Sequence, residues 1–307
     1  MRIFKNRGDI YFSKINKKKS NEQKILITAL VAIIVFTIAF LIFVGVKNDF
    51  SAKKFFAPDE IKTVQNMETQ PFEELPQVSG KANFILLVSS SEELLYVQLV
   101  QVDMDNTSYK VAALKADTEA DGVSFSKIFK QSGAENVKKA AESLLNTEID
   151  YYIQMENKAF ADFFDEMGTV NYPVLADIKF KSSDGDSGYS LKLKTGEQRL
   201  KGAQVVNLVR YYLEEENNTS AANDLLLNCL NQQINSKNLK KSDSLFNSFR
   251  AHANTNITVR NYSMAGDNLT VLANDNTGAG VYSAAAQYDG NSIEQESLQK
   301  LKGYFVK

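Results

Sequence analysis

The sequence contains one cysteine, one histidine and four prolines in 307 residues. A single cysteine, Cys229, cannot form an intramolecular disulfide, so a disulfide-stapled fold is excluded. Cys229 lies in the apolar stretch DLLLNCLNQQI, which indicates a small core residue. A single histidine, His252, cannot build a histidine-based metal site, and a serine protease triad would depend on it alone.

Charged residues are absent from one long segment. Residues 25–46 hold no charged side chain and are bracketed by Lys24 and Lys47. A helix of that length spans about 33 Å, which is enough to cross the hydrocarbon core of a bilayer. The run exceeds the apolar core of a signal peptide, about 7–15 residues, and no A-x-A-like site follows it. We therefore predict an uncleaved transmembrane anchor.

The distribution of charge predicts the orientation of this anchor. Residues 1–24 hold eight Lys/Arg against two acids, which predicts a cytoplasmic basic tail and an extracellular remainder. Residues 48–307 hold 26 basic and 35 acidic residues, a net charge of −9, which argues against nucleic acid as a partner. A disulfide-free, Lys/Asn-rich anchored chain indicates the cell membrane of a Gram-positive bacterium.

The remainder reads as a stalk followed by an α/β domain. Residues 47–79 hold three of the four prolines, which is typical of a stalk. Helical apolar spacing in AENVKKAAESLLN and in NKAFADFFDEMG alternates with β-like runs, which predicts an α/β fold. Gly168 is expected to end the second helix. The expected strands cover residues 82–88, 95–103, 109–116 and 148–155.

The C-terminal part of the sequence has two patterns. From Arg199 to about His252 the apolar spacing predicts helices. Residues 259–307 return to short β-like runs, LTVLAND and AGVYSAAAQYD, before a short amphipathic tail. We expect this last part to be a β-like extension of the same domain.

Five segments together resemble the LytR-CpsA-Psr family of envelope proteins over residues 80–258. They are NFILLVSSSEE, VAALKADT, AAESLLNTEIDYYIQMENKAFADFFDEMGTVNY, LKTGEQRLKGAQVVNLVRYY and NTNIT. The resemblance implies a layered α-β-α domain with a central mixed sheet. It also implies binding of a polyprenyl-pyrophosphate-linked glycopolymer and its transfer to peptidoglycan with the help of Mg²⁺.

The chemistry of such a reaction explains the residue types at the implied site. Guanidinium forks bind phosphate oxygens in pairs, and a carboxylate holds the metal ion. By resemblance, Asp117 is the catalytic and metal-binding carboxylate, and Arg210 is both catalytic and phosphate-binding. Further phosphate or lipid contacts are implied for Lys115, Thr118, Arg199, Phe160, Phe163 and Phe164. The three phenylalanines follow a helical stripe that is equally typical of a protein core.

The sequence departs from the family pattern at the arginines. The family's Pro-Arg-Asp-Thr strand end reads Lys-Ala-Asp-Thr here, with Ala116 in place of arginine. Tyr212 stands where a second arginine follows Arg210, and the stretch NNTSAANDLLL lacks the arginines expected there. These losses predict a weakly active or non-catalytic member that binds a polyprenyl-phosphate lipid.

Two alternatives remain open at this stage. One is an active phosphotransferase with a rearranged charge set of Lys115, Arg199, Lys201 and Arg210. The other is a membrane-anchored interaction module that binds no lipid. Basic side chains gathered around Asp117 would favour the enzyme.

The predicted topology can be tested by protease treatment of intact protoplasts. We expect the protease to remove residues 48–307 and to spare residues 1–24, since positive charge is retained on the cytoplasmic side. Protection of the C-terminal half would contradict this topology.

Overall fold

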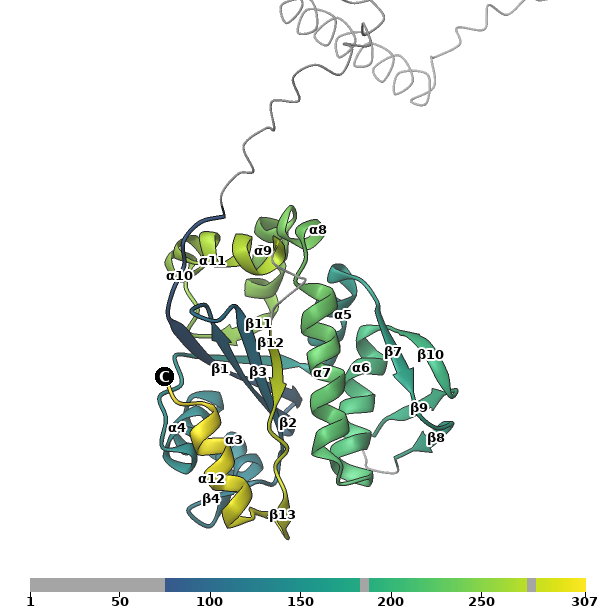
Figure 1. Ribbon diagram of the computed structural model, residues 1–307. Coiled ribbons are helices and arrows are strands. Elements are labelled where there is room, and N and C mark those ends of the chain that lie inside the picture. Colours follow the sequence, from purple (N-terminus) through teal and green to yellow (C-terminus); the bar gives the residue numbers. More distant parts are fainter. Residues whose placement is uncertain (1–74, 183–187, 275–279) are drawn as a thin grey trace, which may run out of the picture. The chain divides into compact units, whose positions relative to one another are not determined.

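The computed structural model describes residues 75–182, 188–274 and 280–307 (Figure 1). These residues form an α/β domain around a six-stranded mixed sheet. The predicted tail, the predicted anchor at 25–46 and most of the predicted stalk lie outside the described residues. Within the described ranges, no helix combines the length and apolar character that a bilayer crossing needs.

The central sheet contains the four strands expected from the sequence and two more. β1 and β2 pair antiparallel, as do β2 and β3, while β6 lies parallel to β1 and β12 parallel to β3. The sheet is therefore mixed. In spatial order its strands are β11 (Ala253–Thr255), β6 (Tyr151–Glu156), β1 (Lys81–Ser90), β2 (Glu93–Asp103), β3 (Ser108–Lys115) and β12 (Gly280–Ser283).

Both faces of the sheet are covered by helices, which gives three layers (Figure 1). One face packs on α3 (Phe125–Ser132), α4 (Ala134–Leu145) and α12 (Gln295–Tyr304). The other packs on α5 (Asn157–Met167), α6 (Gly202–Arg210) and α7 (Thr219–Gln233). Burial on both faces explains why NFILLV is a continuous apolar run rather than an alternating one. The predicted class and layering are confirmed.

The observed ends of the helices agree with the prediction at Gly168 and differ from it at Arg199. Gly168 ends α5 as expected, with a positive φ of 117° and its amide bonded to the carbonyl of Phe164. Arg199 and Leu200, predicted as helical, instead belong to β10 (Gly196–Leu200), which pairs with β7 (Val170–Val174). Outside the central sheet, β8 (Ile178–Lys181) pairs with β9 (Ser190–Leu193).

The prediction of β structure for LTVLAND is wrong. Its residues 269–274 belong to α11 (Gly266–Asn274), and α10 (Val259–Met264) precedes it. Leu269, Leu272 and Ala273 fall at i, i+3 and i+4, so a helix places them on one side, and packing overrides the β-propensity of Thr and Val. The predicted run AGVYSAAAQYD does supply β12 and the short strand β13 (Tyr288–Asp289), which pairs with β14 (Ser292–Ile293).

Two helices complete the end of the domain where β1 begins. α8 (Ser236–Leu239) and α9 (Ser242–His252) lie there beside α10 and α11 (Figure 1). At the other end of the sheet, β4 (Glu119–Ala120) and β5 (Val123–Ser124) form a small hairpin after β3. The two ends of the sheet are thus closed by different kinds of structure.

A β-bulge lies where β1 turns into β2. Val88 pairs with Tyr96 and Ser89 pairs with Leu94, so Leu95 is an extra residue without a partner. A bulge increases strand twist and redirects side chains, and such irregularities are common beside functional sites. Here Leu94 and Leu95 point into different cores, one on each face of the sheet.

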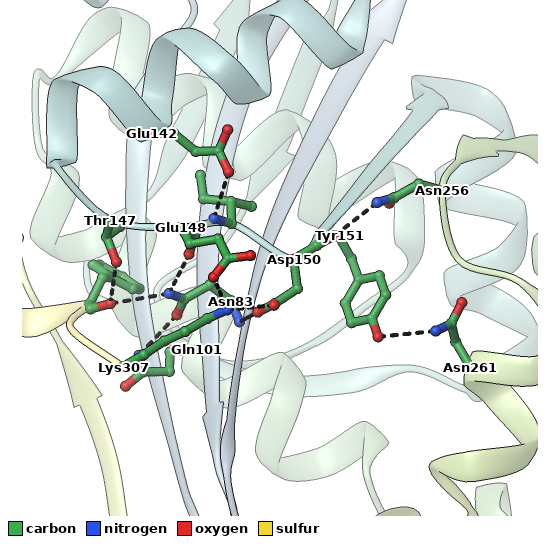
Figure 2. Close-up of polar contacts among 12 residues, drawn as sticks. Asn83, Gln101, Glu142, Thr147, Glu148, Asp150, Tyr151, Asn256, Asn261 and Lys307 are labelled. Carbon is green, nitrogen blue, oxygen red and sulfur yellow. Dashed lines mark hydrogen bonds and ion pairs between the residues drawn. The ribbon is translucent and has the colours of Figure 1, made fainter.

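A polar cluster ties the C-terminus to the start of β1 (Figure 2). The buried Asn83 side-chain amide donates to the carbonyls of Glu148, at 2.8 Å, and Phe305, at 3.1 Å. Its Oδ1 accepts from Gln101, at 2.9 Å, and its backbone amide donates to Asp150, at 2.8 Å. This one side chain therefore satisfies polar groups from three separate segments.

We predict that Asn83→Ala lowers the free energy of unfolding by about 1–3 kcal/mol, because it removes the side-chain hydrogen bonds to the carbonyls of Glu148 and Phe305 and to Gln101 from a buried position. Urea denaturation measures the change. Lys307→Ala is the control, because its ion pair with Asp150 is partly exposed and should contribute less than about 1 kcal/mol. Equal losses in the two variants would contradict this role of Asn83.

Candidate functional site

A cleft of about 690 Å³ opens at the edge of the sheet where β1 ends and β3 ends. The carboxyl ends of strands in open α/β sheets are where ligands usually bind. The β1–β2 turn, the end of β3, α3 and the end of α6 surround it. Its lining consists of Glu92, Glu93, Leu94, Leu95, Lys115, Ala116, Asp117, Ser126, Lys127, Lys130, Arg210, Leu213, Glu214, Glu215 and Asn291. Three of the residues predicted from the sequence, Lys115, Asp117 and Arg210, thus share one cleft.

The turn after β3 is held by Thr118. Its hydroxyl donates to the carbonyl of Lys115, at 2.7 Å, and lies 2.8 Å from the hydroxyl of Tyr288. Thr118 is fully buried and does not line the cleft. In this structure it holds the loop that carries Asp117, rather than presenting its hydroxyl to a ligand.

Lys115 and Ala116 both border the cleft. Consecutive residues of a strand would point to opposite faces, but β3 ends at Lys115 and the chain turns there, so both residues can border the cleft. The Lys115 ammonium lies 4.7 Å from the ring centre of Tyr288, a cation–π contact. Ala116 presents only a methyl group to the cleft.

Asp117 is exposed at the cleft and accepts a hydrogen bond of 2.5 Å from Ser126. No group of three or more His, Cys, Asp or Glu residues among the described ones is placed to hold a metal by itself. Mg²⁺ commonly takes one or two protein carboxylates and completes its shell with water and substrate phosphate. Asp117 is the residue of the cleft that would contribute the carboxylate to such a Mg²⁺ ion.

Arg210 is the one guanidinium in the cleft lining, and Glu214 engages it. Its Nε lies 2.9 Å from Oε1 of Glu214, and one terminal nitrogen lies 3.2 Å from Oε2. Arg210 is only 4% exposed, and its guanidinium stacks 4.2 Å from the ring centre of Tyr189. The two-point contact uses the same fork geometry that a phosphate would use.

The position of Arg210 follows from how α6 packs. A Cβ on Gly202, the first residue of α6, would lie 2.1 Å from the carbonyl oxygen of Ala161, so only glycine allows this approach to α5. The Gly202 amide donates to Asp165 at 2.8 Å. After Arg210 the helix widens into a π-helix, Tyr211–Glu215, a feature found frequently at functional sites.

Tyr212 cannot be a simple replacement for an exposed arginine. It is 6% exposed and belongs to the core under α6 and α7. Burial raises its pKa, and its hydroxyl interacts with that of Tyr172. An arginine at 212 would therefore enter the core instead of the cleft, and restoring charge at this position is not a sound design.

Carboxylates slightly outnumber basic groups around the cleft. The acids are Glu92, Glu93, Asp117, Glu214 and Glu215, and the bases are Lys115, Lys127, Lys130 and Arg210. Since the Arg210–Glu214 pair is internally neutral, the lysines are the remaining basic groups in the lining. A cleft with this balance attracts a pyrophosphate weakly unless a cation accompanies it.

The other predicted site residues lie elsewhere. Arg199 is exposed on β10, where its Nε donates to the hydroxyl of Thr169 at 2.9 Å. Phe164 is buried in the core, and Phe160 packs against that core. Phe163 borders a separate apolar groove of about 240 Å³ among α5, α8, α9, α10 and α11, and its ring centre lies 6.1 Å from that of Phe249.

The lone cysteine takes no part in either hollow. Cys229 is buried in the core on the α7 side of the sheet, and burial raises the pKa of its thiol to about 12. A thiol with so high a pKa stays protonated and unreactive near neutral pH. The interpretation of Cys229 as a core residue is confirmed.

The structure is an α/β domain with a charged cleft at its strand ends, and comparison with known protein families assigns its family. The model of the LytR_cpsA_psr family matches residues 96–303. This match covers more than half of the chain, so the chain belongs to the LytR-CpsA-Psr family.

Relatives are similar to this chain in sequence, and solved structures share its fold. The polyisoprenyl-teichoic acid–peptidoglycan teichoic acid transferase TagV of Bacillus subtilis is 23% identical over 184 residues, 59% of this chain and 46% of TagV. A crystallised protein from Eubacterium siraeum superposes with a TM-score of 0.62, at 19% identity, over 78% of this chain and 97% of that one. The structure titled TagT bound to LI-WTA superposes with a TM-score of 0.53, at 17% identity, over 76% of this chain and 92% of that one. The chain spans less than half the length of the curated relatives it matches.

Sequence reasoning missed two residues that shape the cleft. Glu214 lies four residues after Arg210. This spacing predicts an ion pair on a helix, so the sequence did contain a signal for the contact. Tyr288 lies far along the chain and reaches Lys115 and Thr118 only through the tertiary fold. No local signal in the sequence connects Tyr288 to the strand end.

We predict that Glu214→Gln raises the affinity for inorganic pyrophosphate by about threefold, because it removes a partly exposed carboxylate that competes for the Arg210 fork. Isothermal titration calorimetry measures the affinity. Glu215→Gln is the matched control, since it removes the same charge from the same cleft. Equal gains in the two variants would show that net charge, and not the pairing with Arg210, controls the affinity.

Proposed function

We propose that this chain is a membrane-anchored envelope protein that binds a polyprenyl-pyrophosphate-linked glycopolymer in its extracellular cleft. We further propose that it transfers this glycopolymer far more slowly than relatives with a full set of arginines. Its role in cell-wall assembly is then mainly to bind and hold the lipid-linked polymer. The relatives support the ligand class, and the composition of the cleft supports weak transfer.

The observation that carries the proposal is the state of Arg210. The cleft is built around the strand end Lys115–Ala116–Asp117, yet the guanidinium in its lining is already paired with Glu214. Phosphoryl transfer depends on positioning and neutralising phosphate charge in the transition state. Four basic side chains do share the cleft with Asp117, which is the observation that favours the alternative of an active enzyme. Three of them are lysines, which lack the fork geometry of a guanidinium, and the fourth is Arg210, which is paired with Glu214. We therefore expect slow transfer and not full activity.

The names of the relatives support the ligand class. TagV is named a transferase between polyisoprenyl-linked teichoic acid and peptidoglycan, and TagT was crystallised with LI-WTA. A chain of the same family with a cleft at the strand ends is a reasonable binder of the same chemical class. Which glycan it prefers depends on groups beyond the pyrophosphate.

The residues of the cleft suggest how such a ligand would be held. Lys115, Lys127 and Lys130 would meet the pyrophosphate as point charges, without the paired geometry of guanidinium groups. Asp117, oriented by Ser126, would hold Mg²⁺ together with a phosphate oxygen. The ion, when bound, would neutralise charge on the phosphates. The predicted anchor at 25–46 would keep the domain at the membrane in which the lipid resides.

We predict that the purified full-length protein transfers a lipid-linked glycan about 10³-fold more slowly than a family member with the full set of arginines, by analogy with losses of a single catalytic arginine. Transfer to peptidoglycan fragments, with Mg²⁺ present, measures the rate. Fast Mg²⁺-dependent transfer that Asp117→Ala abolishes would contradict the proposal.

A gain-of-function variant provides the complementary test. Ala116→Arg places a guanidinium at the cleft, and the double variant Ala116→Arg/Glu214→Gln should bind geranyl pyrophosphate at least about tenfold more tightly, since bidentate contacts to phosphate are strong. Tyr212→Arg is the negative control, because its side chain enters the core. No gain in the double variant would indicate that the cleft is not a pyrophosphate site.

A further inference from the structure

A second hollow, the side pocket, lies next to the cleft at the same end of the domain. It has a volume of about 430 Å³ and is formed by residues 216–220, residues 285–288 and Glu294. Glu215 lines the cleft and Glu216 lines the side pocket, so one stretch of chain borders both. β13, which carries Tyr288, lies at the same end of the domain as β4, which follows the end of β3 (Figure 1).

The side pocket differs from the cleft in its charge. Among the described residues that line it there is no lysine or arginine, and its two charged residues are the carboxylates Glu216 and Glu294. Such a lining opposes the binding of a phosphate group. Its apolar residues are only Ala285, Ala286 and Tyr288, which are too few to hold a lipid tail. The side pocket therefore suits a neutral, polar part of a ligand.

The remaining side chains of the lining are amides and hydroxyls. Asn217, Ser220 and Gln287 are exposed, and within the described residues their side chains hydrogen-bond to no other residue. A side-chain amide both donates and accepts hydrogen bonds, as does a hydroxyl, whereas a carboxylate only accepts. The hydroxyl groups of a sugar also donate and accept, so this set of side chains matches a neutral sugar ring.

The walls of the side pocket are bonded to each other. The Thr219 hydroxyl donates to the carbonyl of Ala286, at 2.8 Å, and joins the start of α7 to the segment before β13. The backbone amide of Gln287 donates to the hydroxyl of Ser297 at 2.9 Å, and that of Glu294 donates to the carbonyl of Gln287 at 2.8 Å. The exposed side chains are therefore carried by a backbone that is already held in place, and a ligand binds without much rearrangement.

Tyr288 connects the side pocket to the site residues of the cleft. It lines the side pocket, while its hydroxyl accepts from the backbone amide of Lys115 at 3.2 Å and lies 2.8 Å from the hydroxyl of Thr118. The Lys115 ammonium, which borders the cleft, lies over the same ring. A phosphate at Lys115 and a group in the side pocket would therefore both lie beside Tyr288.

We propose that the side pocket is a saccharide subsite, which binds a neutral sugar unit while the cleft holds the pyrophosphate. Asn217, Ser220 and Gln287 donate to and accept from the sugar, and Glu216 and Glu294 accept from further hydroxyls. This inference rests on the proposed function, which places a glycan-bearing pyrophosphate in the cleft. The sugar belongs either to that glycopolymer or to the wall glycan that accepts it, and both sources offer the same chemistry.

The test uses the full-length protein in a detergent without a sugar headgroup, and the probe is chitotetraose, a neutral oligomer of N-acetylglucosamine. Saturation-transfer NMR measures its binding. We expect Gln287→Ala to weaken binding by about five- to tenfold, because it removes an amide that forms more than one hydrogen bond with the sugar. Gln295→Ala is the matched control: Gln295 is exposed at the start of α12, outside the lining of the side pocket, and its loss should leave binding unchanged.

A pair of pyrophosphate compounds identifies the source of the sugar. Geranyl pyrophosphate carries no sugar, whereas geranyl-pyrophosphoryl-N-acetylglucosamine carries one. If the sugar is that of the glycopolymer, the second compound should bind at least about tenfold more tightly than the first, lose this gain in Gln287→Ala and displace chitotetraose. If the sugar is that of the acceptor, chitotetraose should still bind to protein that is saturated with the second compound.

Two results would overturn the saccharide subsite. One is the absence of chitotetraose binding together with equal affinities for the two geranyl compounds. The other is chitotetraose binding that falls equally in Gln287→Ala and Gln295→Ala, or in neither. A protein that gives either result but binds geranyl pyrophosphate retains the proposed function. Chitotetraose binding that depends on Gln287, in a protein that does not bind geranyl pyrophosphate, would support the subsite and contradict the ligand proposed for the cleft.

Discussion

The burial of the central sheet on both faces is the constraint from which the rest of this domain follows. A sheet covered on both faces leaves only its edge strands and its strand ends for a site. Here β1 and β3 run in the same direction, so their carboxyl ends lie at the same end of the sheet. Close packing of the covering helices then sets where the functional side chains lie. The contact of Gly202 with the Ala161 backbone brings α6 against α5, and Arg210 at the far end of α6 reaches the cleft.

The pairing of Arg210 with Glu214 is the main electrostatic feature of the cleft. A buried guanidinium needs an anionic partner, because an unpaired buried charge is strongly unfavourable. In an active transferase a phosphate can fill that need, whereas here Glu214 fills it from the next turn of the helix. A phosphate that binds here, as we propose, would have to compete with Glu214 for the Arg210 guanidinium.

The two ends of the sheet use polar side chains differently. At the carboxyl ends of β1 and β3, the charged cleft and the side pocket of amides and hydroxyls leave polar side chains exposed. At the other end, polar side chains pair with one another. The polar cluster around Asn83 binds the C-terminal segment to the start of β1, so the termini of the domain are fastened near each other (Figure 2).

The amino-acid sequence by itself determined the α/β class and the positions of β1, β2, β3, α4 and α5, while only the resemblance to the family implied that Lys115, Asp117 and Arg210 belong to one site. Apolar periodicity and strand order are local signals, and the strand ends on one sheet edge follow from topology. Only the tertiary structure decided that Thr118 turns inward, that Tyr212 is core, that Phe163 is separated from Phe164, and that LTVLAND is helical. These outcomes depend on side chains distant in the sequence, such as Tyr288 and Tyr172, because burial and pairing are properties of the packed chain and not of any local segment.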